Sequence, residues 1–222
     1  MAEYGIELNS NEFRDVVKRL VKEYKITEVV ETGTFLGNGS TKVFAGEGLN
    51  VFTIECNPNH LSQAVKNLES NNYNVCFIHG LSLKRENLIK GLMSMTFPEG
   101  GIYDSARPKV FYTQEILQPV LVEDALNLFA KNETRQLVFL DSAGGVGYLE
   151  FVEFMSWPLS VRREKVLLLD DVTHVKHAKS VQSLKDWGFD IKLSSDGRFA
   201  WCQFIDGSNA EIQVSVKTMK RL

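Results

Sequence analysis

The sequence contains few of the features that stabilise small extracellular domains or span membranes. Its three cysteines, Cys56, Cys76 and Cys202, are odd in number and widely spaced, with no CxxC pair and no zinc-like spacing. We therefore expect three small buried side chains in a reducing compartment and no disulfide. No apolar run approaches the roughly 20 residues that span a bilayer. Because residues 1–13 lack the basic and apolar stretches of a secretory signal, we expect a cytoplasmic protein.

An excess of positive charge is also missing. The chain has 222 residues, with 25 Lys and Arg against 28 Asp and Glu, and a formal net charge of -3 at pH 7. This balance does not attract nucleic acid or an anionic membrane, so we expect neither as a partner. The content of 44% hydrophobic and 24% charged residues is typical of a globular protein. A chain of this size buries roughly 70% of its unfolded surface, so we expect one domain over residues 1–222 that needs no structural metal.

Apolar runs and helical segments alternate along most of the chain. Residues 1–25 contain an amphipathic lead-in helix that Ser10 or Asn11 can cap. Five segments then read as nearly continuous Val, Ile, Leu and Phe, which indicates strands buried on both faces. The predicted fold is an α/β, Rossmann-like fold with helices on both faces of a mostly parallel sheet. The strand segments are 26–32, 50–55, 74–80, 136–142 and 165–171, with helices predicted near 39–46, 58–70 and 83–93.

The C-terminal third departs from this alternation. Segments 188–195 and 197–205 are two strands joined by a tight turn at 195–197, and they predict a C-terminal antiparallel hairpin. This hairpin completes a seven-stranded sheet. In the tail, 207–222, apolar and polar residues alternate over 212–216, which predicts an additional edge strand.

An insertion separates the third and fourth predicted strands. Residues 94–118 fit neither a helix nor a strand well, and they contain Pro98, Gly100, Gly101 and Pro108. A segment of this length is usually a functional loop or a disordered one. Its aromatic side chains are candidates for a lid over a substrate, for packing onto the domain, or for the contact of a homodimer. These alternatives stay open.

A glycine-containing turn, ETGTFLGNGS (31–40), follows directly from the first predicted strand. Gly33 and Gly37 let the backbone turn sharply and approach a flat ligand that a Cβ would strike, although a purely structural turn is the alternative. The glycines stand at positions 33, 37 and 39, so neither the GxGxxG of a dinucleotide site nor the GxxxxGK[ST] of a P-loop is present.

This turn resembles the first motif of the class I S-adenosylmethionine-dependent methyltransferases, an acidic residue followed by x-Gly-x-x-x-Gly. ETGTFLG fits the motif at Glu31, Gly33 and Gly37. The resemblance covers about residues 26–206 and implies the same fold, in which the seventh strand is antiparallel. It also implies that the glycines lie against the methionine part of S-adenosylmethionine and that Glu31 helps to hold its amino group.

Two further positions fit the same resemblance. Glu55 ends the second strand, where the family has an acid that binds both ribose hydroxyls, and a carboxylate has two acceptor oxygens for such a diol. A nicotinamide site also has an acid here, and a solvated strand end is a third interpretation. Ser82 follows the third strand and either caps the next helix or donates to the adenine ring.

Three carboxylates, Asp141, Asp170 and Asp171, end the fourth and fifth predicted strands. Open α/β sheets bind ligands at the carboxyl ends of their strands, and neighbouring strands would bring these side chains together. Like charges repel at short range unless they are protonated or bridged by a cation, and oxygen ligands suit Mg²⁺ or Ca²⁺. The alternative is that they cap a helix or accept from backbone amides and that no metal binds.

The carboxylate set is similar to that of the metal-dependent catechol-type and macrolide-sugar O-methyltransferases. This resemblance implies that Asp141, Asp170 and Asp171 hold Mg²⁺, that Asp141 also borders the cofactor, and that the metal chelates two adjacent acceptor hydroxyls. The catechol pattern has a lysine base where this chain has Gly144. His174 is therefore the candidate base, with a surface or capping role on a helix as the alternative for both His174 and His177.

Together these features predict an S-adenosylmethionine-dependent methyltransferase that acts on an oxygen of a small hydroxylated acceptor, with assistance from a divalent metal. A non-catalytic protein that keeps the fold and binds cofactor or a partner is an alternative, because the family's lysine is missing. An NAD-dependent oxidoreductase is less favoured, because GxGxxG is missing and the hairpin is unusual for that fold.

Overall fold

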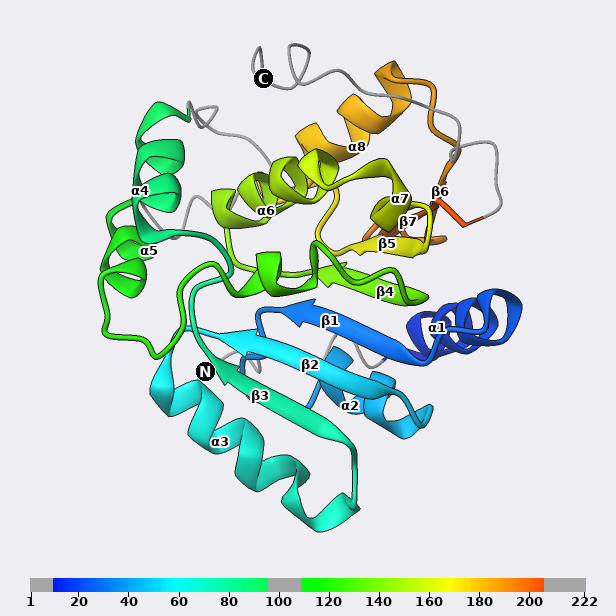
Figure 1. Cartoon of the computed structure of the whole chain (residues 1–222), viewed down its shortest axis with the longest axis horizontal. Helices are drawn as coiled ribbons and strands as arrows, with labels where there is room; N and C mark the ends of the chain where they lie inside the picture. Colours follow the sequence, from blue (N-terminus) through cyan, green and yellow to red (C-terminus); the bar gives the residue numbers. More distant parts are fainter. Residues whose placement is uncertain (1–9, 96–108, 206–222) are drawn as a thin grey trace.

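A seven-stranded mixed sheet forms the centre of the computed structural model, which describes residues 10–95 and 109–205. The strands are β1 (Glu28–Thr32), β2 (Asn50–Glu55), β3 (Val75–His79), β4 (Gln136–Leu140), β5 (Lys165–Leu169), β6 (Ile191–Leu193) and β7 (Ala200–Gln203). Their order across the sheet is β3-β2-β1-β4-β5-β7-β6 (Figure 1). The first five strands pair in parallel, whereas β7 is antiparallel to both β5 and β6. The predicted α/β fold and C-terminal antiparallel hairpin are confirmed.

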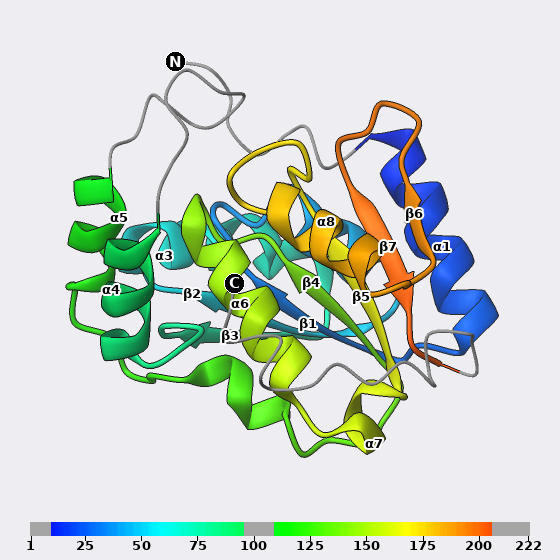
Figure 2. The same ribbon diagram turned by 90° about the horizontal axis from the view of Figure 1, so that it is seen from above.

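Helices cover both faces of this sheet (Figures 1 and 2). On one face lie α1 (Asn11–Tyr24), α2 (Ser40–Gly46) and α3 (Pro58–Leu68). On the other lie α4 (Arg85–Ser94), α5 (Lys109–Ile116), α6 (Gly145–Ser156) and α8 (Ala178–Asp186). The short helix α7 (Leu159–Arg162) connects α6 to β5, and two 3₁₀ helices span Glu69–Asn71 and Ala125–Phe129.

Side chains along β1 alternate between two hydrophobic cores, as the period of two in a strand requires. Val29 packs into the core under α1 and α2, whereas Val30 packs into the core under α4, α5 and α6. Glu31 and Thr32 continue this alternation, with Glu31 bonded to α2 and Thr32 bonded to α6. Two adjacent residues at the end of β1 therefore bind helices on opposite faces of the sheet.

The lead-in helix is confirmed, with ends set by the local sequence. Ser10 Oγ accepts the backbone N–H of Phe13 at 3.2 Å, and Lys25 ends the helix with a φ of 52°. Residues 109–116 correct a prediction, because they form α5 within a segment interpreted as irregular. Tyr112 on this helix is buried against the main domain, and this long-range contact leaves no local pattern in the sequence. Residues 96–108 and the predicted tail strand lie outside the described residues.

The cysteines are free thiols, and their burial differs from the prediction at two of the three positions. Cys202 in β7 is buried and Cys56 is partly buried, but Cys76 is exposed. Cys76 lies on β3, which is an edge strand of the sheet that residues 10–95 and 109–205 form. Among residues 10–95 and 109–205, no helix has the length and apolar character needed to cross a membrane.

Candidate active site

The candidate site lies where the carboxyl ends of β1, β2, β4 and β5 meet. The strand order reverses between β1 and β4, and open α/β sheets bind ligands at such a switch point. Thr32 connects the elements there, since its Oγ1 accepts from the backbone N–H of Asp141 at 3.1 Å and donates to Oε2 of Glu150 at 2.8 Å. The predicted site residues all lie in strands β1 to β5 or in the loops that follow them.

The glycine turn is fixed by contacts inside the protein. Gly33 has a φ of +82°, and a Cβ there would lie 2.7 Å from the carbonyl oxygen of Asp141. Gly37 has a φ of +71°, and its Cβ would lie 3.1 Å from Cβ of Ala64 on α3. Positive φ and lack of space both favour glycine at these positions. The two glycines are therefore required by packing, whatever ligand the turn contacts.

Glu31 lies below this turn and is fully buried. Its carboxylate accepts hydrogen bonds from the hydroxyls of Ser40, Thr41 and Thr53. Burial raises the pKa of Glu31, and these three hydrogen bonds oppose the shift. Because its oxygens face the α2 side of the sheet, the side chain holds α2 against β1 and β2. The contact with a cofactor amino group that the resemblance implies would need an accessible oxygen, and Glu31 has none in this arrangement.

Glu55 ends β2 beside the glycine turn and is only 8% exposed, so the interpretation as a solvated strand end is wrong. Its Oε1 accepts the backbone N–H of Asn57 at 2.8 Å, and its Oε2 accepts that of Phe35 at 2.9 Å. Burial raises the pKa of Glu55, and the two backbone amides oppose this shift. The thiol of Cys56 is a further, weak donor to this carboxylate. A carboxylate has about four lone-pair sites, so acceptor capacity remains.

Ser82 does not cap the helix that follows it, because the N-cap of α4 is Lys84. Its hydroxyl is instead hydrogen-bonded to Glu150, a fully buried residue of α6. Glu150 also accepts from Ser142 at 2.6 Å and from Thr32 at 2.8 Å. Burial raises the pKa of Glu150, and the three hydroxyls oppose the shift. One carboxylate therefore connects the end of β1 with the loops after β3 and β4.

Sequence reasoning missed Glu150, although a signal was present. The helix GVGYLEFVEFMS is mostly apolar, and a carboxylate inside such a helix needs polar partners if it is buried. Ser82 and Ser142 follow two predicted strands at the same edge of the sheet, which made them suitable donors.

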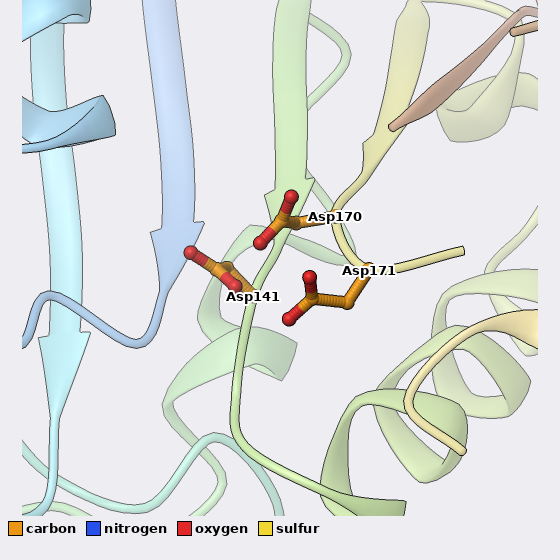
Figure 3. A group of neighbouring side chains, drawn as sticks. All are labelled: Asp141, Asp170 and Asp171. Atoms are coloured by element: carbon orange, nitrogen blue, oxygen red, sulfur yellow. The ribbon is translucent and has the colours of Figure 1, made fainter. Parts of the chain in front are cut away.

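The predicted convergence of Asp141, Asp170 and Asp171 is confirmed (Figure 3). One oxygen from each carboxylate lies within 4.8 Å of the others. Asp141 follows β4, while Asp170 and Asp171 follow β5, and these strands are parallel neighbours. Asp171 has a φ of 51°, an uncommon backbone conformation for a residue other than glycine.

A lysine that sequence reasoning missed lies among these carboxylates. Nζ of Lys176 is 2.5 Å from Oδ1 of Asp141, 2.9 Å from Oδ2 of Asp171 and 3.5 Å from Oδ2 of Asp170. Arg198 adds a second cation, with Nε 3.2 Å from Oδ1 of Asp170. Three carboxylates thus face two positively charged side chains.

The charged groups in this cluster shift one another's pKa values. Burial alone would lower the pKa of Lys176, but the surrounding carboxylates raise it above its ordinary value, so the ammonium stays protonated. Burial raises the pKa of Asp141, with Lys176 acting in the opposite direction. Burial also acts to raise the pKa of Asp171, but Lys176 and Arg198 together bring it below its ordinary value.

The segment after β4 has no space for a side chain at position 144. Gly144 has a φ of +58°, and a Cβ there would lie 2.5 Å from the ring of Tyr112. Gly147, one turn further along, leaves space for Lys176, because a Cβ would lie 2.6 Å from Cγ of that side chain. The ammonium at this site therefore comes from the loop after β5 instead of the loop after β4.

The two histidines have different positions, and neither lies within a helix. His174 is in the turn before α8, with its backbone N–H donating to the carbonyl of Asp171 at 2.9 Å. His177 precedes α8 and is fully buried, with Nε2 2.9 Å from the carbonyl oxygen of Leu140 and Nδ1 3.1 Å from Oγ of Ser180. Burial lowers the pKa of His177 to about 3. The predicted surface role is wrong for His177, but this residue does occupy the N-cap position of α8, without a capping hydrogen bond from its side chain.

Comparisons with protein-family models and with curated proteins gave no match. Solved structures do match. A caffeoyl-CoA O-methyltransferase candidate from Staphylococcus aureus aligns with a TM-score of 0.51 and 16% identity, over 87% of this chain and 84% of its own. The SAH-bound methyltransferase PaMTH1 from Podospora anserina aligns with a TM-score of 0.50 and 12% identity, over 87% of this chain and 78% of its own. The chain therefore shares the Rossmann-like fold of these two structures.

Proposed function

We propose that the protein is an S-adenosylmethionine-dependent methyltransferase that acts on an oxygen of a small hydroxylated acceptor. The observation that carries this proposal is the position of Glu55 beside the glycine turn. Its carboxylate is nearly buried at the end of β2, held by one backbone N–H on each oxygen and by the Cys56 thiol, with acceptor capacity left. In a methyltransferase fold, this arrangement suits a ribose diol.

Residues at the carboxyl ends of β1 and β2 would each bind a different part of the cofactor. Glu55 would accept from the two ribose hydroxyls, and the backbone of the turn at Gly33 and Gly37 would lie against the methionine part. Glu31 would keep this turn and α2 in place from below, through its bonds to Ser40 and Thr41. When bound, S-adenosylmethionine supplies an electrophilic methyl group on a positively charged sulfur.

The acceptor would lie on the β4 and β5 side of the same edge. Transfer of a methyl group to a hydroxyl oxygen releases the hydroxyl proton, so a base must accept it. Asp171 is the most exposed of the three clustered carboxylates, and His174 follows it in the same turn. We propose His174 as the base, positioned by the Asp171 turn.

The sequence predicts that the same three carboxylates bind a divalent metal ion. Carboxylate oxygens are suitable ligands for Mg²⁺. However, Nζ of Lys176 lies within 3.5 Å of an oxygen of each of them, so the residues as arranged do not fit a divalent ion in addition to the lysine. The proposed reaction therefore uses no metal.

Ligand-induced stabilisation separates this proposal from the oxidoreductase alternative. S-adenosylmethionine and its demethylated product should each raise the midpoint of thermal unfolding, and NAD should not. A ligand at about 100 times its dissociation constant stabilises the native state by about 2.7 kcal/mol. Stabilisation by NAD alone would contradict the proposal.

An acceptor screen separates an active enzyme from a non-catalytic protein with the same fold. Small hydroxylated compounds would be incubated with the protein and S-adenosylmethionine, and products analysed by mass spectrometry for the addition of one methyl group. A product that forms with wild-type protein and is absent with the Glu55→Ala variant would support the proposal. Cofactor binding without any product across a broad panel would favour the non-catalytic alternative.

A further inference from the structure

The carboxylate cluster has a source of positive charge within the chain. An ammonium group has three N–H donors and no acceptor. Nζ of Lys176 lies close to three carboxylates, at 2.5 Å from Asp141, 2.9 Å from Asp171 and 3.5 Å from Asp170, which matches this donor capacity. Since its donors are directed at the cluster, Lys176 acts on the carboxylates and not on a substrate.

Two neighbouring features fix the position of this lysine. On α6, Gly147 leaves the space that the stem of Lys176 fills, since a Cβ at Gly147 would lie 2.6 Å from Cγ of the lysine. The next residue, His177, is anchored to the carbonyl of Leu140 at the end of β4. The Lys176 side chain is only 8% exposed. These contacts distinguish it from a surface lysine that meets a carboxylate by chance.

We propose that Lys176 is the resident cation of the cluster, and that its ammonium takes the place of a divalent metal ion. Three converging carboxylates need a cation nearby, because like charges in a buried site repel. Lys176 meets this need in the centre of the cluster, and Arg198 does so at its border with Asp170. This inference stands on the contacts alone, and only its consequence for catalysis rests on the proposed function.

An ammonium group in place of a metal ion limits the class of acceptor that the site can bind. A divalent ion can hold two oxygens of an acceptor by chelation. An ammonium whose donors are engaged with Asp141, Asp170 and Asp171 cannot. We therefore expect an acceptor that presents a single hydroxyl to the site, and methyl transfer that is unaffected by a chelator.

Metal binding by the wild-type protein tests the inference without using cofactor or acceptor. Mn²⁺ would be titrated into full-length protein, with free ion followed by electron paramagnetic resonance. We expect no saturable binding of one Mn²⁺ at millimolar concentration. Stoichiometric binding to wild-type protein would overturn the inference, whether or not the protein proves to be a methyltransferase.

The Lys176→Met variant tests whether the ammonium fills a cation site. Methionine keeps the length of the stem and removes the charge, so the carboxylates should bind Mn²⁺ at least about tenfold more tightly than in wild-type protein. Mn²⁺ should also raise the midpoint of thermal unfolding of this variant. Failure of the folded variant to bind Mn²⁺ would overturn the inference, and if the variant does not fold, the wild-type titration decides.

Three control variants locate the effect. Lys176→Arg keeps a positive charge and should bind no Mn²⁺. Lys176→Met/Asp171→Asn should lose the gained site, which places the ion among the carboxylates. Lys179→Met removes an exposed lysine three residues away on α8 and should behave as wild type. Gain of Mn²⁺ binding in Lys179→Met would show a general charge effect and would contradict the assignment to Lys176.

Discussion

Two regions along the same edge of the sheet hold buried carboxylates with different partners. At the β1 and β2 edge, Glu31 accepts from hydroxyls and Glu55 accepts from backbone amides. At the β4 and β5 edge, Asp141 and Asp171 are paired with the ammonium of Lys176. Neutral donors orient a carboxylate and leave its charge, whereas an ammonium compensates the charge. The first edge therefore suits a ligand with hydroxyl donors, and the second has its cation already in place.

Removal of the internal cation should have the largest effect on stability. Lys176→Met leaves the carboxylates of Asp141 and Asp170 buried without their shared partner, and breaking a buried pair on one side costs about 3–5 kcal/mol. The measurement is the free energy of unfolding in urea without divalent ions. Lys179→Met is the matched control and should change it by less than about 0.5 kcal/mol. A loss from Lys176→Met equal to that of the control would contradict the ionic character of this edge.

Removal of the Glu150 carboxylate should have a smaller effect on stability. Glu150→Ala leaves the hydroxyls of Thr32, Ser82 and Ser142 without their acceptor in a buried site, and we expect a loss of about 2–3 kcal/mol. Glu150→Gln keeps one acceptor oxygen at nearly the same size and should lose about 1 kcal/mol. Equal losses in urea unfolding for the two variants would indicate that volume, and not hydrogen bonding, determines the role of Glu150.

Protonation of His177 on unfolding should make the protein less stable as the pH falls. Its pKa is lowered by burial to about 3 in the folded protein, against about 6.5 in an unfolded chain. Between these values the unfolded state binds the additional proton, so stability is lost as the pH falls from 6.5 towards 3. The loss from this residue should reach about 2 kcal/mol at pH 5.

The matched variant for this prediction is His177→Asn, whose uncharged polar side chain does not titrate between pH 7 and pH 5. Urea unfolding at pH 7 and pH 5 gives the change for each protein. We expect a smaller change for the variant than for the wild type. The same change in both would mean that His177 does not titrate on unfolding in this range.

Much of the fold could be predicted because the strands of a covered parallel sheet are continuously apolar. The same property placed Asp141, Asp170 and Asp171 together, since neighbouring strands end at one edge. The orientation of Glu31 could not be predicted, because alternation along a strand does not reveal which face carries which helix. The position of Glu55 at this edge could be predicted, because the last residue of a strand remains near the edge on either face.

The charge partners of the acid cluster could not be predicted for a different reason. Lys176 lies five residues after Asp171 in a turn that has no periodic pattern, and it looks like an ordinary exposed lysine in the sequence. Arg198 reaches Asp170 from the turn before β7, across 28 residues of chain. Only the three-dimensional path of these loops shows that the cluster contains its own cations. Helix α5 was missed likewise, since Tyr112 finds its contact at Gly144.

Calorimetric titration of S-adenosylmethionine into wild-type protein and into the Glu55→Ala variant tests the central claim most directly. The exposed Glu69 at the end of α3 gives the control variant, Glu69→Ala. The account predicts one site per chain in wild type and control, with affinity at least about tenfold weaker in Glu55→Ala, because hydrogen bonds to a charged group contribute about 1.5–3 kcal/mol. Equal affinity in all three proteins, or no binding to the wild type, would contradict it.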